Sequence, residues 1–126
     1  MKLNLFLIGI GGAIGSILRY CTALWFVRIY ASNFIPYSTM FINFAGSLLI
    51  GIVFGLAERY QWMTPQWRLF LVTGICGGYT TFSAFAYENV SLLQQANYTG
   101  FALYTSLSFV LGLIAVVLGL SLVKIF

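Results

Sequence analysis

The stretch GICGGYTTFSAF, residues 74–85, stands within a long apolar segment and has an unusual order of glycines and threonines. Gly77 and Gly78 come first, and Thr80 and Thr81 follow after one residue. Glycine permits backbone conformations that end a helix, and a threonine hydroxyl can cap the helix that starts next. We therefore predict a helix that is broken near Gly77–Thr81. Close packing of another helix against the glycines is the alternative, but it would not require the threonines.

The whole chain has the composition of an integral membrane protein. Of its 126 residues, 61% are hydrophobic and 6% are charged, whereas a soluble domain has about 25% charged residues. The mean hydropathy is +0.98. Four helices of about 20 residues fit this length with short connections. We expect an all-α integral membrane protein with four transmembrane helices, the third of them broken, and no separate soluble domain.

Prolines and aromatic residues place the spans. Pro36 and Pro65 stand where helices can begin, because the missing N–H of proline costs nothing in the first turn. Trp62 and Trp67 lie in the polar segment 58–68, at the level of a membrane interface. One domain is expected over residues 1–126, with spans at about 3–30, 36–57, 66–95 and 100–126.

The composition also excludes several kinds of chemistry. The chain has no histidine, so it has no imidazole base and no histidine metal ligand. Cys21 and Cys76 share no metal-ligand spacing, and we interpret both as small buried hydrophobic residues. The net charge of +4 comes from scattered residues. We expect neither an enzyme nor a nucleic-acid partner, because nucleic-acid binding would require a basic run.

The few charges orient the chain only weakly in a membrane. With four spans, one positive residue, Arg28, would lie on the side opposite the termini. Four positive residues on the side of the termini favour a cytoplasmic location for both ends. A change of one or two charges would remove this bias, so the chain can insert in both orientations. The four residues are Lys2, Arg59, Arg68 and Lys124.

A helix break inside a membrane would leave backbone groups that lipid cannot pair. The first half-helix would end in free carbonyls, and the second would begin with free N–H groups. Such groups must face protein, water or an ion. The carbonyl oxygens of Gly77 and Thr80 would suit a small hard cation such as Na⁺.

Two other spans carry small and polar residues at a spacing of four, which places each set on one helical face. Asn43 is the strong polar group of one set. Its carboxamide can donate two hydrogen bonds to an anion, or it can join two helices. A narrow polar track and ordinary helix contacts both remain open. The sets are Asn43, Ser47, Gly51 and Gly55, and Tyr104, Ser108 and Gly112.

Two charges and two aromatic rings inside the predicted spans have two interpretations each. Arg19 either faces an aqueous cavity, where it would attract anions, or extends toward the interface. Glu88 is either a proton site or an interfacial carboxylate, and its place near the end of the third span favours the second. Phe82 and Phe85 share a face beside the predicted break. They either pack in the core or turn their positive ring edges toward an anion.

Three segments resemble the signature segments of a known family, the Fluc, or CrcB, fluoride channels. They are GGAIGSILRY (11–20), NFAGSLLIG (43–51) and GGYTTFSAF (77–85), in the family's order and in a chain of similar length. The resemblance covers essentially the whole sequence. One departure is Ala84, where relatives usually have Ser or Thr, so a hydroxyl between the two phenylalanines is missing.

The resemblance implies a protomer that pairs with an inverted copy of itself in an antiparallel, dual-topology homodimer with two fluoride pores. It also implies a structural Na⁺ at the dimer centre, which is required for activity but is not transported. The ligands of this Na⁺ would be the carbonyls of Gly77 and Thr80, and Arg19 matches a vestibule arginine. The fluoride pore would involve Asn43, Phe82, Phe85, Ser83 and Tyr104, and we add Ser108 from the helical stripe.

The function implied by this resemblance is passive export of fluoride through a bacterial-type inner membrane, which would give fluoride resistance. The inside-negative potential would drive the anion outward. The alternative is a small dual-topology, proton-coupled multidrug exporter, which needs an acid within the membrane. The first span contains no acid, and Glu88 is the only substitute. A subunit that transports nothing would explain the glycines but not the segment 77–85.

Overall fold

The structure, a computed structural model, describes residues 1–29 and 35–126, which are helical almost throughout. Four segments have the length and the apolar composition needed to cross a membrane. The expected end of the first span, at about residue 30, lies outside the described residues. The elements are α1 (Lys2–Ile29), α2 (Tyr37–Arg59), α3 (Pro65–Arg68), the π-helix η1 (Leu69–Cys76), α4 (Gly77–Tyr79), α5 (Phe82–Gln94) and α6 (Tyr98–Ile125).

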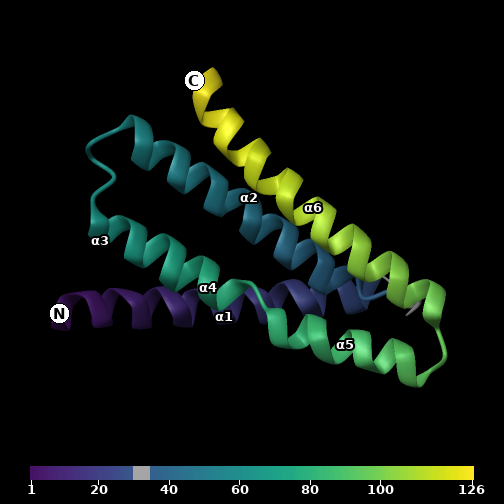
Figure 1. The fold of residues 1–126 in the computed structure, drawn as a ribbon. Coiled ribbons are helices and arrows are strands. Elements are labelled where there is room, and N and C mark those ends of the chain that lie inside the picture. Colours follow the sequence, from purple (N-terminus) through teal and green to yellow (C-terminus); the bar gives the residue numbers. More distant parts are fainter. Residues whose placement is uncertain (30–34) are drawn as a thin grey trace.

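The helices pack mainly in two groups (Figure 1). α2 and α6 lie side by side, and α1 packs against η1 and α4. Both termini and the connection between α2 and α3 lie at one end of the molecule. The connection between α5 and α6 lies at the opposite end. The third span, from Pro65 to Gln94, therefore runs between the two ends as α3, η1, α4 and α5.

Glycines bring α1 very close to the first half of the third span. A Cβ atom at Gly15 would overlap with the carbonyl oxygen of Ile75, and one at Gly78 would overlap with the carbonyl oxygen of Gly12. The two helices therefore touch backbone to backbone. Close contact through small residues is the main way in which helices associate in lipid, where apolar burial provides no driving force.

α2 and α6 approach each other in the same way. A Cβ atom at Gly51 or at Gly119 would overlap with a backbone carbonyl oxygen of the other helix. Near the chain termini, Nη1 of Arg59 donates a hydrogen bond of 2.6 Å to the carbonyl oxygen of Val123. This bond satisfies one of the last carbonyls of α6, which lack a partner in their own helix.

The third span is not a regular α-helix. It begins at Pro65, after Thr64, whose Oγ1 accepts a hydrogen bond of 3.4 Å from the N–H of Trp67. It then widens into the π-helix η1, after which the N–H of Gly77 donates to the carbonyl of Val72, five residues back. We did not predict this wide segment, since nothing in its apolar composition marks it. Segments of π-helix are rare and often lie at functional sites.

Two residues of extended backbone, Thr80 and Thr81, separate α4 from α5. Their φ and ψ angles are −77° and 159° at Thr80, and −151° and 119° at Thr81. Oγ1 of Thr81 accepts a hydrogen bond of 3.2 Å from the N–H of Ala84 and so caps α5. Gly77 and Gly78, by contrast, are helical. Gly78 serves close packing against α1, whereas Gly77 has no close neighbour outside its own helix, and the extended conformation falls on the threonines.

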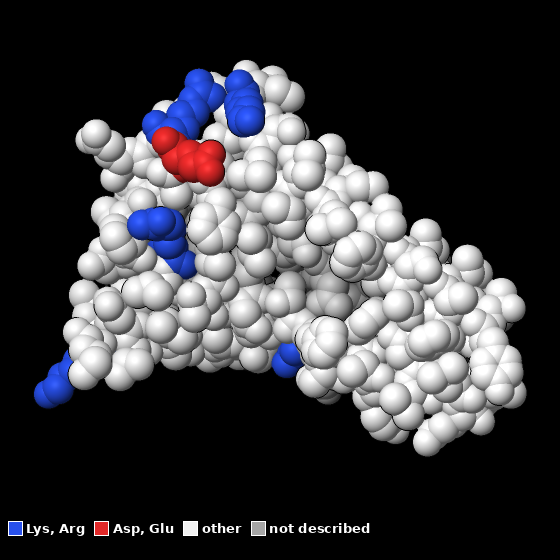
Figure 2. Space-filling view, in the orientation of Figure 1, with Lys and Arg blue, Asp and Glu red and all other residues white. Residues whose placement is uncertain are grey.

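The outer surface is apolar, and most charged groups gather at one end. On the face drawn in Figure 2, Lys, Arg and acidic side chains lie mainly near the end that carries both termini, one basic group lies near the middle, and the far end shows none. Cys21 lies on the exposed surface, so the expectation that it is buried was wrong, whereas Cys76 is buried. An apolar neighbourhood does not reveal burial in such a chain, because apolar residues face lipid as well as the core.

Replacement of Gly15 by alanine tests the contact between backbones. We expect Gly15→Ala to lower the melting temperature of the purified protein in detergent, because forced separation of packed groups costs about 1–3 kcal/mol. Gly9 lies on the same helix, and no heavy atom lies within 4 Å of a Cβ placed there. Gly9→Ala is therefore the matched control and should melt like the wild type. Equal melting temperatures of the two variants would contradict the contact.

Candidate functional site

A cavity of about 440 Å³ lies beside the extended residues Thr80 and Thr81. Its walls come from α2, α5, α6 and the extended pair, so it unites side chains from three separate spans. Five of the predicted site residues line it: Asn43, Thr80, Phe82, Phe85 and Ser108. The remaining lining residues are Thr81, Thr105 and Phe109.

Asn43 holds the extended backbone of Thr81 with both polar atoms of its side chain. Its Oδ1 accepts a hydrogen bond of 2.9 Å from the N–H of Thr81. Its Nδ2 donates a hydrogen bond of 3.1 Å to the carbonyl oxygen of the same residue. The carboxamide thus acts like a neighbouring peptide and satisfies groups that the extended conformation withdraws from a helix. One hydrogen of Nδ2 remains after these two bonds.

Ser108 provides a second hydrogen-bond donor at the cavity, the hydroxyl of its side chain. Its Oγ is buried and, within the part of the chain that the structure describes, has no hydrogen-bond partner. A buried hydroxyl without a partner is costly and indicates a ligand or a water molecule. The free hydrogen of Asn43 Nδ2 and the hydroxyl of Ser108 therefore give the cavity donors suited to an anion.

Two phenylalanine rings of α5 stand beside these donors. The centroids of the Phe82 and Phe85 rings are 6.0 Å apart, at an interplanar angle of 41°. Phe85 also contacts the ring of Tyr104, at 5.1 Å between centroids. Tyr104 is fully buried and does not line the cavity. It therefore reaches the cavity only through Phe85, whereas Phe82 is 80% exposed.

Three other predicted site residues do not line the cavity. Oγ of Ser83 lies 3.3 Å from Oγ1 of Thr81. Nη1 of Arg19 donates a hydrogen bond of 3.2 Å to the carbonyl oxygen of Thr80. Gly77 lies in α4 and is exposed on the surface of the chain. Arg19 is thus attached to the extended backbone, a contact that its position in α1 did not reveal.

Glu88 joins three helices at one end of the site. Its Oε1 accepts a hydrogen bond of 2.7 Å from the hydroxyl of Thr39 on α2. Its Oε2 accepts a hydrogen bond of 2.6 Å from the hydroxyl of Tyr104 on α6. Both carboxylate oxygens therefore have hydroxyl partners within the protein, and the residue connects α5 to its two neighbours.

Three polar residues near the site were missed by sequence reasoning: Thr39, Asn89 and Thr105. Thr39 stands four residues before Asn43, so the spacing that marked the polar stripe could have included it. The hydroxyl of Thr105 donates a hydrogen bond of 2.9 Å to Oδ1 of Asn89. Asn89 is a polar residue within the third span, and the argument applied to Asn43 would have marked it as well.

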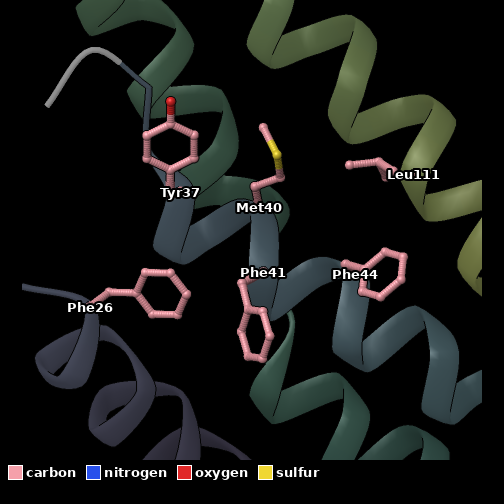
Figure 3. A pocket seen from close by; sticks show the side chains of 6 residues that line it. All are labelled: Phe26, Tyr37, Met40, Phe41, Phe44 and Leu111. Carbon is pink, nitrogen blue, oxygen red and sulfur yellow. The ribbon is translucent and has the colours of Figure 1, made fainter. Parts of the chain in front are cut away.

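A second cavity, of about 430 Å³, is unsuited to an anion (Figure 3). It lies between α1, α2 and α6, and aromatic, thioether and aliphatic side chains face it. These groups supply no cluster of hydrogen-bond donors, and the site is therefore assigned to the first cavity. The lining residues are Phe26, Tyr37, Met40, Phe41, Phe44 and Leu111.

Backbone carbonyls are the available ligands for a hard cation. Within residues 1–29 and 35–126, no group of three or more His, Cys, Asp and Glu side chains could hold a metal ion. The carbonyl oxygen of Thr80 lies on extended backbone and accepts the hydrogen bond from Arg19. A carbonyl oxygen has two lone pairs, so this oxygen can accept a further partner.

Comparison with known proteins gives a consistent family. The chain matches the family model described as CrcB-like protein, Camphor Resistance (CrcB), over residues 6–120. It is 48% identical to the fluoride-specific ion channel FluC of Flavobacterium psychrophilum over 121 residues, which cover 96% of this chain and 97% of that protein. It is 42% identical to the FluC protein of Azobacteroides pseudotrichonymphae over 126 residues, the full length of both. The FluC protein of Leptospira interrogans is 41% identical over 123 residues.

Replacement of Asn43 by aspartate tests its hold on Thr81. Aspartate keeps an acceptor for the N–H but places a second oxygen against the carbonyl oxygen, so one bond becomes a repulsion. We expect the variant to lose about 1–3 kcal/mol of stability, as for a buried polar group left unpaired, and to melt several degrees lower in detergent. Asn4→Asp makes the same change in α1 and should have little effect. An unchanged melting temperature for Asn43→Asp would show that the two bonds do not hold the backbone.

Proposed function

The chain belongs to the CrcB-like family, and on that premise we propose that it is a fluoride-specific ion channel that conducts passively. The observation that carries this proposal is the cavity beside Thr80 and Thr81, which has free hydrogen-bond donors and no acidic residue in its lining. The three relatives named above carry names for the same activity. The chain is a multi-pass membrane protein of a channel family and not an enzyme.

Fluoride holds its water shell tightly, so a path that conducts it must replace this water with strong hydrogen-bond donors. A selective path has to offer donors at close quarters, as channel filters do for other ions. Here the donors are the remaining N–H of Asn43 and the hydroxyl of Ser108. The edges of the Phe82 and Phe85 rings carry partial positive charge and extend this environment. A carboxylate in the wall would repel the anion, and none is present among the lining residues.

A passive channel is sufficient for export. Hydrogen fluoride enters cells as a neutral weak acid and dissociates in the more alkaline cytoplasm. The inside-negative potential then drives the trapped anion outward at about 2.3 kcal/mol per 100 mV. Because this force is already present, no ATP site and no proton relay are needed. We place the chain in the inner membrane of a bacterial-type cell, where this potential exists.

Proton-coupled drug export is the weaker alternative. It needs an acid that binds and releases protons during transport. Glu58 stands at the very end of α2, so Glu88 is the acid that lies within a span. Both oxygens of Glu88 accept hydrogen bonds that connect α5 to Thr39 and Tyr104. These bonds fit a fixed structural connection better than a group that must change partners in every cycle.

Part of the proposal is that two inverted copies form the conducting unit. Ser83 is exposed beside the extended pair Thr80 and Thr81, and Gly77 is exposed as well. Polar backbone and side chains at such a surface cannot face hydrocarbon without cost. A second copy would cover them, and a two-fold axis would give both copies the same environment. An antiparallel arrangement is possible because 6% charged residues give only a weak preference for one orientation.

A structural Na⁺ at the two-fold axis completes the proposal. Each chain would contribute the carbonyl oxygens of Gly77 and Thr80, so two chains would offer four oxygens. The second lone pair of the Thr80 oxygen makes this compatible with the hydrogen bond from Arg19. Bound at the axis, the ion would join the two extended segments electrostatically and would not move through either pore.

Efflux from liposomes tests the function. The purified chain is reconstituted into vesicles loaded with potassium fluoride or potassium chloride, and valinomycin starts anion efflux. We expect rapid loss of fluoride and almost no loss of chloride, because fluoride accepts stronger hydrogen bonds than chloride from donors such as those of Asn43 and Ser108. Phe6→Ile, in α1 away from the cavity, should leave the rate unchanged. Equal rates for the two anions, or no flux at all, would refute the proposal.

The same vesicles test the cation when they are prepared with and without Na⁺. Removal of Na⁺ from both sides should abolish fluoride efflux, and its return should restore it. Efflux that continues at the full rate without Na⁺ would remove the cation from the proposal. The selectivity for fluoride would still be tested separately, by the comparison of fluoride efflux with chloride efflux.

A further inference from the structure

The hydroxyl of Thr105 makes an unusual bond for a membrane helix. Hydroxyls on such helices commonly donate to the carbonyl one turn back in their own helix. Thr22 does so toward the carbonyl of Leu18, and Ser121 toward that of Val117, both at 2.8 Å. Thr105 instead donates to Oδ1 of Asn89, on the neighbouring helix, at 2.9 Å.

Asn89 also bonds to the backbone of its own helix, at Phe85. Its Nδ2 donates a hydrogen bond of 3.1 Å to the carbonyl oxygen of Phe85. The residue is 7% exposed, so the carboxamide is removed from lipid and water. A continuous pair of hydrogen bonds therefore runs from Thr105, which lines the cavity, through Asn89 to Phe85.

The rotation of α5 about its axis decides what Phe85 faces. One residue corresponds to about 100° of rotation, so a slip of one position would turn the ring away from the cavity. Apolar contacts fix this rotation on one side only, where Leu92 and Phe85 pack with Tyr104. On the other side, Phe82, Tyr87 and Val90 are 80%, 76% and 50% exposed.

Directional bonds between helices fix the rotation of α5 more sharply. Glu88 bonds to Thr39 and Tyr104, and Asn89 adds a bond to Thr105, on the side of the helix that faces the cavity.

The bond also determines which hydrogen-bonding groups of Thr105 are available to the cavity. Its hydroxyl hydrogen points toward Asn89, so its oxygen offers lone pairs and no donor to an anion. The donors of the cavity are then limited to those of Asn43 and Ser108. Release of Thr105 would add a donor and loosen Phe85 at the same time.

We propose that Asn89 is a positioning residue for the conduction path: its bonds to Thr105 and to the Phe85 carbonyl hold α5 in the rotation that keeps the Phe85 ring at the cavity. This inference rests on the proposed function, because it assigns Asn89 to the same path. Asn89 does not touch the ion in this role. It acts through Phe85 and through the orientation of Thr105.

The test is a double-mutant cycle of Asn89→Leu and Thr105→Val, two changes that nearly preserve side-chain shape. Each single variant should lower fluoride efflux from liposomes about three- to tenfold, as expected for loss of one hydrogen bond between membrane helices. The double variant should be no slower than the slower single variant, because both changes remove the same connection. Thr105→Ser keeps the hydroxyl and should conduct faster than Thr105→Val.

Thermal melting in detergent separates positioning from general stability. Each single variant leaves a polar group unpaired and should melt lower than the wild type. The double variant removes both partners of the bond and should melt close to the wild type, while its flux stays low. Ser121→Ala removes a hydroxyl from α6 that bonds only within that helix and should change neither property.

The results that would refute the role of Asn89 differ from those that would refute the proposed function. If the wild type conducts fluoride and both single variants conduct it at the same rate, the role of Asn89 is refuted and the channel function is not. Additive losses in the double variant, or losses that follow melting temperature alone, would refute it as well. If Asn89→Leu does not fold, Thr105→Val and its comparison with Thr105→Ser decide the question. Absence of fluoride efflux in the wild type would refute the proposed function itself.

Discussion

The paired hydrogen bonds between Asn43 and the backbone of Thr81 are the interaction on which the rest of the site depends. An extended segment inside a membrane has N–H and C=O groups without helical partners, and lipid cannot supply any. The carboxamide offers an acceptor and a donor at the right separation, so it replaces a peptide of a neighbouring strand. With Thr81 held, its hydroxyl caps α5 and directs Phe82 and Phe85 toward the cavity.

The scarcity of charge gives the polar contacts their influence. In water, a single hydrogen bond between helices would compete with solvent, whereas here each polar group must find a partner in the protein. Arg19, Glu88 and Asn89 are all bound to other parts of the third span or to its neighbours. Ser108 stands apart because its buried oxygen has no partner among the described residues. That contrast distinguishes groups that hold the structure from groups available to an ion.

Hydropathy and prolines predicted the four apolar helices, because a bilayer imposes length and composition directly on the sequence. The spacing of four marked Gly51 and Gly55, and both lie close against α6. Gly78, which was placed in the predicted break, instead packs against α1. The π-helix η1 was not predictable, since its apolar sequence LFLVTGIC carries no signal that distinguishes it from an α-helix. The extended backbone falls on Thr80 and Thr81 and not on the glycines, because Asn43, 38 residues away from Thr81, supplies the bonds that stabilise it. The family, by contrast, was recognisable from three short segments, and the comparisons confirm it.

Silver block of a cysteine at position 108 is the most direct test of whether the cavity beside Thr80 and Thr81 is the ion path. Silver fluoride is soluble, so Ag⁺ can be added to vesicles during fluoride efflux, and the wild type with Cys21 and Cys76 serves as the control for native thiols. If the cavity conducts, Ag⁺ will stop fluoride efflux through Ser108→Cys and leave the wild-type rate unchanged. Undiminished efflux through Ser108→Cys, with the thiol shown by mass spectrometry to carry silver, would contradict the assignment of the path to this cavity.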